Sequence, residues 1–184
     1  MLKLIKEKES KAKELMKIMG LNEFNYYFSY FVIYFFINLL HAIFNALIVK
    51  YILNYIEYGY LFILFFLYGL VIFSLIFFFQ SFLEKANISI IFCLLVYAIM
   101  YFIGMPLQTN AVNKAVKILF ALLFPPINVS FGCITIAQFQ KNSNKFNGRV
   151  NMNYDKYSVC DMYIVFIFNF ILYIFIGFYL QNVL

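Results

Sequence analysis

The sequence predicts an all-α membrane protein, a polytopic bundle of helices that cross the bilayer. Hydrophobic residues make up 65% of the 184 positions and charged residues 12%, whereas soluble domains carry about 25% charged residues. Apolar runs of about 20 residues, the length that a helix needs to cross the hydrocarbon core, occur several times along the chain. A soluble core of this size could not bury so much apolar surface, so lipid is the expected solvent.

Four apolar segments are expected to span the membrane completely, within a transmembrane domain at residues 23–184. Tyrosines lie near the ends of all four segments, as interfacial anchors do. Glu84 and Lys85 close the second segment, and Pro106 closes the third. The four predicted spans are residues 26–49, 60–83, 88–105 and 160–183.

A fifth segment, residues 115–139, is apolar enough to cross but is interrupted in its middle. Pro125 and Pro126 remove two adjacent backbone donors there, and the polar Asn128 follows. Irregular backbone is not tolerated where it would contact lipid. The segment is therefore expected to be kinked inside the bundle or to form a re-entrant hairpin.

The basic residues give their own indication of topology. Six of the fourteen Lys and Arg residues lie in the first seventeen positions, which favours a cytoplasmic N-terminus beside anionic headgroups. Five full crossings would then place eleven basic residues inside and three outside, whereas a re-entrant hairpin would place seven on each side. The positive-inside rule alone therefore favours five crossings and an external C-terminus.

The N-terminal residues 1–22 are expected to form a cytoplasmic amphipathic helix. Two acid–lysine pairs have the favourable i,i+4 order, Glu7 with Lys11 and Glu9 with Lys13. A helix stop is expected at the glycine that follows the apolar face. That face consists of Ala12, Leu15, Met16 and Met19, and the glycine is Gly20. By pattern alone, a solvated surface helix explains these residues equally well.

Two stripes of polar residues lie inside the predicted spans. In the first span, Tyr34, Asn38, His41 and Asn45 are spaced 4, 3 and 4 and share one helical face. Interhelical hydrogen bonds, worth about 0.6 to 2 kcal/mol each, are the favoured explanation. A substrate-facing or proton-sensing cavity at Asn38, His41 and Asn45 is the alternative. A weaker stripe in the last span, better explained by close packing, consists of Asn169, Tyr173 and Gly177.

The sequence holds no recognisable catalytic machinery. It has no intramembrane acid pair, no nucleophile–base arrangement, no HExxH and no GxxxxGK[ST] phosphate loop. We therefore expect no enzymatic activity, cofactor or metal in this chain, and any energy source would lie on another polypeptide segment. A nucleic-acid partner is not expected either, because the basic residues border apolar spans and build no groove-reading motif.

Four segments resemble a known family. EKESKAKELMKIMGL (residues 7–21) resembles a hallmark of the A subfamily of ATP-binding cassette (ABC) transporters, the lipid exporters, which reads roughly EKExxLKExMxIMGL. FLEKANIS (82–89) is similar to the family's FSRANLA-type turn, and FPPINVSFG (124–132) to its SPVAFGFG-type segment. FNFILYIFIGFYLQNV (168–183) resembles the final span, FDTxLYxxLxWYxxxVFPG, with Asn169 in place of the usual Asp. The resemblance covers nearly the whole chain, although the loop after Gln138 lacks the family's Glu-rich, Gly-Trp pattern.

The resemblance implies part of a type II ABC exporter transmembrane domain, namely the last four spans of a six-span half. Residues 115–139 would be a re-entrant exofacial hairpin broken at Pro125 and Pro126, which returns the C-terminus to the cytoplasm. We prefer this topology to the charge count, because an exported C-terminus could not reach an ATPase. Residues 7–20 would be the coupling helix that receives force from that ATPase. Its implied coupling residues are Glu7, Glu9, Lys13, Glu14, Met16 and Gly20.

The expected function is that of the membrane part of an ATP-driven transporter for lipids or other amphipathic substrates. ATP and magnesium would bind to a nucleotide-binding domain that is absent from this chain. The implied partners are that domain and a second transmembrane half, in cis or in trans, together with the bilayer and a lipid substrate. The alternatives are a stand-alone membrane subunit that pairs with a separate ATPase, and a membrane scaffold that transports nothing.

Overall fold

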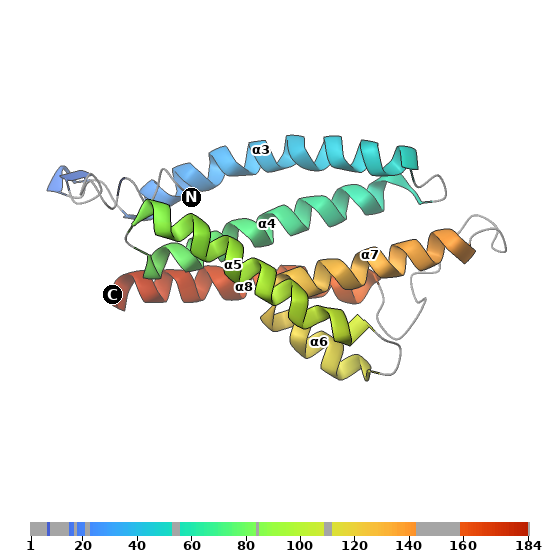
Figure 1. The fold of residues 1–184 in the computed structure, drawn as a ribbon. Coiled ribbons are helices and arrows are strands. Elements are labelled where there is room, and N and C mark those ends of the chain that lie inside the picture. Colours follow the sequence, from blue (N-terminus) through green and yellow to red (C-terminus); the bar gives the residue numbers. More distant parts are fainter. Residues whose placement is uncertain are drawn as a thin grey trace.

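A computed structural model describes residues 7, 15–16, 18–20, 23–52, 56–83, 85–108, 112–142 and 159–183. All regular structure in these residues is helical, which confirms the predicted all-α fold class (Figure 1). The elements are α3 (Glu23–Ile52), α4 (Tyr58–Phe82), α5 (Ala86–Gly104), the 3-10 helix η1 (Met105–Gln108), α6 (Lys114–Leu123), α7 (Pro125–Asn142) and α8 (Val159–Val183).

Four helices among the described residues are long and apolar enough to cross a membrane. Their apolar spans are Asn25–Ile52, Tyr58–Phe82, Ile88–Leu107 and Val159–Gln181. The number of full crossings expected from the sequence is thereby confirmed. Large aliphatic and aromatic side chains remain exposed along α3 and α5, as expected for helices whose solvent is lipid.

Ring contacts and hydrogen bonds fix the directions of the three longest helices. The ring centroids of Tyr27, at the start of α3, and Phe77, near the end of α4, lie 5.1 Å apart, so these helices are antiparallel. The hydroxyl of Tyr163 donates to the carbonyl of Tyr60 (2.8 Å) near the starts of α8 and α4, which run parallel. Tyr27 also contacts Phe178 at 6.1 Å. The start of α3 and the end of α8 therefore lie at the same end of the bundle (Figure 1).

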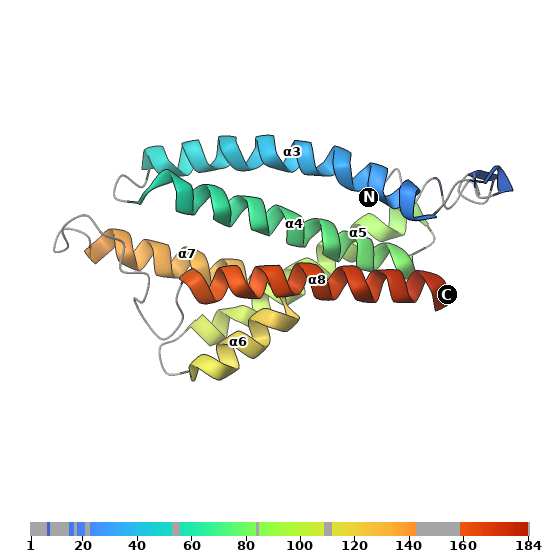
Figure 2. The same cartoon turned by 180° about the vertical axis from the view of Figure 1, so that it is seen from behind.

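Helices α6 and α7 form a hairpin that enters and leaves the bundle at the opposite end. At its mouth Lys114 Nζ lies 2.5 Å from Asp161 Oδ2, beside the start of α8. The apex is held by Tyr173, which a rise of 1.5 Å per residue places about 21 Å along α8 from its start. Helix α7 then returns (Figure 2), and Ile136 packs against the buried cluster of Ala46, Ile56 and Leu61, near the end of α3 and the start of α4.

This re-entrant arrangement confirms the hairpin and corrects the charge count. The fifth full crossing that the basic residues favoured is not found in the described part of the chain. The reason is local, because the Pro-Pro pair ends α6 at Leu123 and starts a new helix at Pro125. Counting charges assumes that every apolar segment of sufficient length is one straight helix, and this segment is two.

Candidate functional site

The apex of the hairpin is a point where a helix has lost its own hydrogen-bond donors. In an α-helix each N–H bonds to the carbonyl four residues earlier, so the ring of Pro125 leaves the carbonyl of Ala121 without a helical donor. The N–H of Ile127 bonds to the carbonyl of Phe124 at 3.0 Å, and not to the carbonyl of Leu123, its helical acceptor four residues earlier. The carbonyls of Ala121 and Leu123 therefore need donors from elsewhere, because an unsatisfied carbonyl at membrane depth costs several kcal/mol.

Two side chains of α8 supply these donors. Asn169 donates from Nδ2 to the Ala121 carbonyl at 3.0 Å, and the Tyr173 hydroxyl donates to the Leu123 carbonyl at 2.6 Å. Their spacing of four residues places both on one face of α8, and both are buried. The stripe that the sequence analysis explained by packing therefore also caps α6. Asn169 Oδ1 is buried and has no hydrogen-bond partner among the described residues.

The second leg of the hairpin is attached to α8 as well. Asn128, which is fully buried, donates from Nδ2 to the Met162 carbonyl at 3.1 Å. A Cβ at Gly132 would collide with the Met162 sulfur, so α7 and α8 approach closely there. Since both legs are bonded to α8, a displacement of α8 would move the hairpin with it.

The mouth of the hairpin carries two lysines of α6. Lys114 forms its ion pair with Asp161 at the surface. Lys117 lies one turn deeper, is 6% exposed, and holds its ammonium 5.7 Å from the ring centroid of Phe131 on α7. A cation over an aromatic face is stabilised by the ring quadrupole, more so when it is shielded from water. Lys117 thus links the two legs of the hairpin.

The polar stripe of α3 divides into two parts. Asn38 is buried and donates to the Phe66 carbonyl of α4 at 3.0 Å, and Tyr34 donates to the Gly69 carbonyl at 3.0 Å. These bonds are the interhelical contacts that the sequence analysis favoured. His41 is exposed instead, and Asn45 donates to the His41 carbonyl at 2.9 Å on the same helix. Asn38, His41 and Asn45 line neither the aromatic cavity nor the cavity between α4 and α5, and their cavity role stays a prediction.

Gly69→Ala is expected to lower the free energy of unfolding by about 1–3 kcal/mol, the usual cost of overpacking a core. A Cβ at this position would collide with the Asn38 amide, which would have to give up its bond to Phe66. Gly59→Ala, on the same helix, meets no atom within 4 Å and is expected to leave stability unchanged or slightly raised. Thermal unfolding of both variants in one detergent makes the comparison. Equal stabilities would contradict the close contact.

The N-terminal segment is anchored to the start of α3. The carboxylate of Glu7 accepts hydrogen bonds from the hydroxyls of Tyr26 (2.5 Å) and Tyr30 (2.7 Å), and Met16 packs against the buried cluster that contains Tyr26. Gly20 has φ of 90°, the left-handed conformation that glycine adopts at helix ends. The other predicted coupling residues, Glu9, Lys13 and Glu14, lie outside the described residues. The coupling role of the segment stays a prediction.

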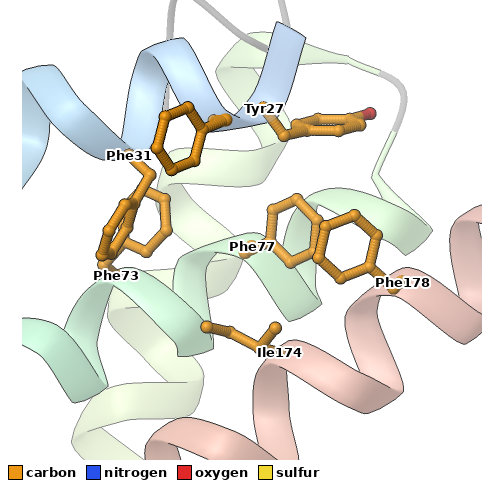
Figure 3. Close-up of a pocket in the computed structure, with 7 residues that line it drawn as sticks. Tyr27, Phe31, Phe73, Phe77, Ile174 and Phe178 are labelled. Atoms are coloured by element: carbon orange, nitrogen blue, oxygen red, sulfur yellow. The ribbon is translucent and has the colours of Figure 1, made fainter. Parts of the chain in front are cut away.

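An aromatic cavity lies next to the part of α3 that binds Glu7, where α3, α4 and α8 meet. Figure 3 shows the rings of Tyr27 and Phe31 from α3, Phe77 from α4 and Phe178 from α8 around it. Its volume is about 100 Å³, which is too small for a whole lipid. The rings of Tyr27 and Phe178 lie 6.1 Å apart, so this region joins the end of α8 to α3, the helix that receives the N-terminal segment.

Comparison with known proteins agrees with this architecture. The profile of a family described as ABC-2 family transporter protein matches residues 1–180. A comparison with individually curated proteins finds no significant match. The matched family consists of multi-pass membrane components that pair with an ATP-binding component, and the helix arrangement agrees with a type II exporter transmembrane domain. Since the match covers almost the whole chain, this protein belongs to the ABC-2 family of transporter proteins.

Proposed function

We propose that the chain is the membrane-spanning part of an ATP-driven transporter related to the A subfamily, which moves lipids or other amphipathic substrates across or out of the bilayer. The observation that carries the proposal is the attachment of the N-terminal segment to α3. Its sequence resembles the hallmark of the lipid exporters, and its Glu7 is hydrogen-bonded to the first turns of α3. ATP and Mg²⁺ would bind to a nucleotide-binding domain outside this chain.

Two connections would carry motion from that domain into the membrane. The first runs from the N-terminal segment through Glu7 to Tyr26 and Tyr30 on α3. The second runs along α8, whose Asn169 and Tyr173 hold the hairpin apex. Because the start of α3 and the end of α8 lie at the same end of the bundle, one partner domain could act on both.

We infer that this end of the bundle faces the cytoplasm. A topology reporter fused after Leu184 should then be protected from external reagents in intact cells. The sequons that begin at Asn87 and Asn128 should both remain unglycosylated, since the first would face the cytoplasm and the second lies in the hairpin. Efficient external labelling of the reporter would reverse the assigned orientation.

Reconstitution tests the proposed activity. The full chain would be purified from its native membrane together with any ATP-binding subunit that accompanies it, and placed in vesicles that contain a fluorescent phospholipid. ATP is expected to increase the accessibility of that lipid to an external quencher, and an ATPase-dead subunit is expected to abolish the increase. An active ATPase that never moves lipid would exclude lipid as the substrate. A chain that never associates with an ATPase would favour the non-transporting scaffold.

A further inference from the structure

Helices α4 and α5 contact each other at two levels, and a second cavity extends between these levels. At one level the hydroxyls of Tyr68 and Tyr97 are hydrogen-bonded to each other. At the other, the ring centroids of Phe79 and Phe92 lie 5.9 Å apart in an edge-on arrangement. The cavity has a volume of about 220 Å³. It is the larger of the two cavities described here, and no residue of the polar stripe of α3 lines it.

The walls of this cavity offer little for water to bind. Val71 and Leu75 of α4 face Ile90 and Cys93 of α5, and Pro125 at the hairpin apex also lines it. The two tyrosine hydroxyls on its wall are bonded to each other, so only one of their two O–H groups can still donate. A buried water needs two to four polar partners, so the cavity is dry. An empty apolar cavity forfeits the dispersion contacts of its lining atoms, which favours a hydrocarbon occupant.

The position of the cavity determines which hydrocarbon can reach it. Leu94, on its rim, is 67% exposed. Only 11% of the most apolar part of the span Ile88–Leu107 is buried, so α5 faces lipid over most of its surface. The lining positions of α4, residues 68–76, cover about 12 Å along the helix axis, enough for part of an extended chain. Lys85 is exposed directly before the start of α5, about 7.5 Å before Ile90, where its charge would attract a lipid phosphate.

We propose that this cavity is a binding site for one acyl chain of a bilayer phospholipid. The chain enters from the lipid face of α5 and lies along α4, with its end toward Pro125 at the hairpin apex. The bound lipid then fills the contact between α4, α5 and the hairpin. The proposal does not rest on transport, because binding requires neither ATP nor a partner subunit.

Lipid retention by the wild-type chain is the first test. The full chain would be reconstituted in vesicles of palmitoyl-oleoyl phosphatidylcholine, extracted again in a mild maltoside detergent, and examined by native mass spectrometry. One phospholipid retained per chain is the expected result. No retained phospholipid in the folded wild-type protein would overturn the proposal, whatever any variant does.

A matched pair of variants assigns the retained lipid to this cavity. Cys93→Phe places a ring in the cavity, whereas Leu95→Phe adds a ring on the lipid side of the same helix, where Leu95 is exposed and lines neither cavity. Retention is expected to fall at least tenfold in the first variant and to stay unchanged in the second. Equal retention in both would overturn the assignment. If Cys93→Phe does not fold, Leu94→Trp against Leu95→Trp makes the same comparison at the rim.

Discussion

Tyr173→Phe is expected to lower the free energy of unfolding by about 1–3 kcal/mol, although it removes only one oxygen atom. The Leu123 carbonyl would lose the donor that holds it at 2.6 Å, and a buried acceptor left unsatisfied costs about that much. Lipid cannot replace the lost donor, as water would at a protein surface. The measurement is unfolding by heat or by a denaturing detergent, followed by circular dichroism.

Tyr179→Phe is the matched control, because Tyr179 lies on the same helix and is 67% exposed. It is expected to change stability by less than about 0.5 kcal/mol. Asn169→Leu should resemble Tyr173→Phe, since it removes the donor to Ala121. Part of that cost would be offset, because the substitution also removes the buried, unpartnered Oδ1. If Tyr173→Phe and Tyr179→Phe were equally stable, the hydroxyl would not cap α6.

The spans and the break at the proline pair were predictable because they depend on properties of single segments. The residues alone left a kink and a re-entrant hairpin open, and the family resemblance favoured the hairpin. Length and apolarity define a span, and two adjacent prolines prevent one continuous helix whatever surrounds them. The same reasoning explains where the charge count was wrong. It counted the basic residues in the loops on either side of residues 115–139, but it took no account of the break at Pro125, where the chain reverses its direction within the segment.

The caps on the hairpin were not predictable in the same way. Asn169 and Tyr173 bond to backbone carbonyls 48 and 50 residues away. Every residue has a backbone carbonyl, so the residue type does not show which carbonyl accepts a bond. The available signal was indirect. A proline pair leaves backbone carbonyls of the preceding turn without N–H donors, and two polar side chains at i,i+4 spacing in another span can supply donors. Linking the two signals required knowing that α6 and α8 run side by side.

Glu7 illustrates the other limit of the sequence. Its spacing predicted an ion pair with Lys11, which lies outside the described residues. The carboxylate also accepts bonds from Tyr26 and Tyr30, which are separated from it by 19 and 23 positions. An i,i+4 rule describes one isolated helix, so it could not show that this carboxylate lies against the first turns of α3.

Glu7→Ala is expected to uncouple ATP hydrolysis from export in the assembled transporter. It removes the acceptor of two tyrosine hydroxyls, and charged hydrogen bonds contribute about 1.5–3 kcal/mol each. A coupling free energy of 1–3 kcal/mol corresponds to about 5- to 150-fold, so export and substrate-stimulated hydrolysis should fall at least about fivefold. Basal hydrolysis should remain, because the proposed function places the nucleotide site outside this chain. Both rates would be measured in proteoliposomes at equal protein content.

The double variant Tyr26→Phe with Tyr30→Phe removes the same contact from the α3 side and is expected to reproduce the loss. Glu57→Ala is the control, since Glu57 is an exposed glutamate at the other end of the bundle, before the start of α4. It should leave export unchanged. Loss in Glu7→Ala but not in the tyrosine variant would mean that the carboxylate acts on the ATP-binding partner directly. Wild-type export in both would mean that the N-terminal segment does not couple ATP hydrolysis to export.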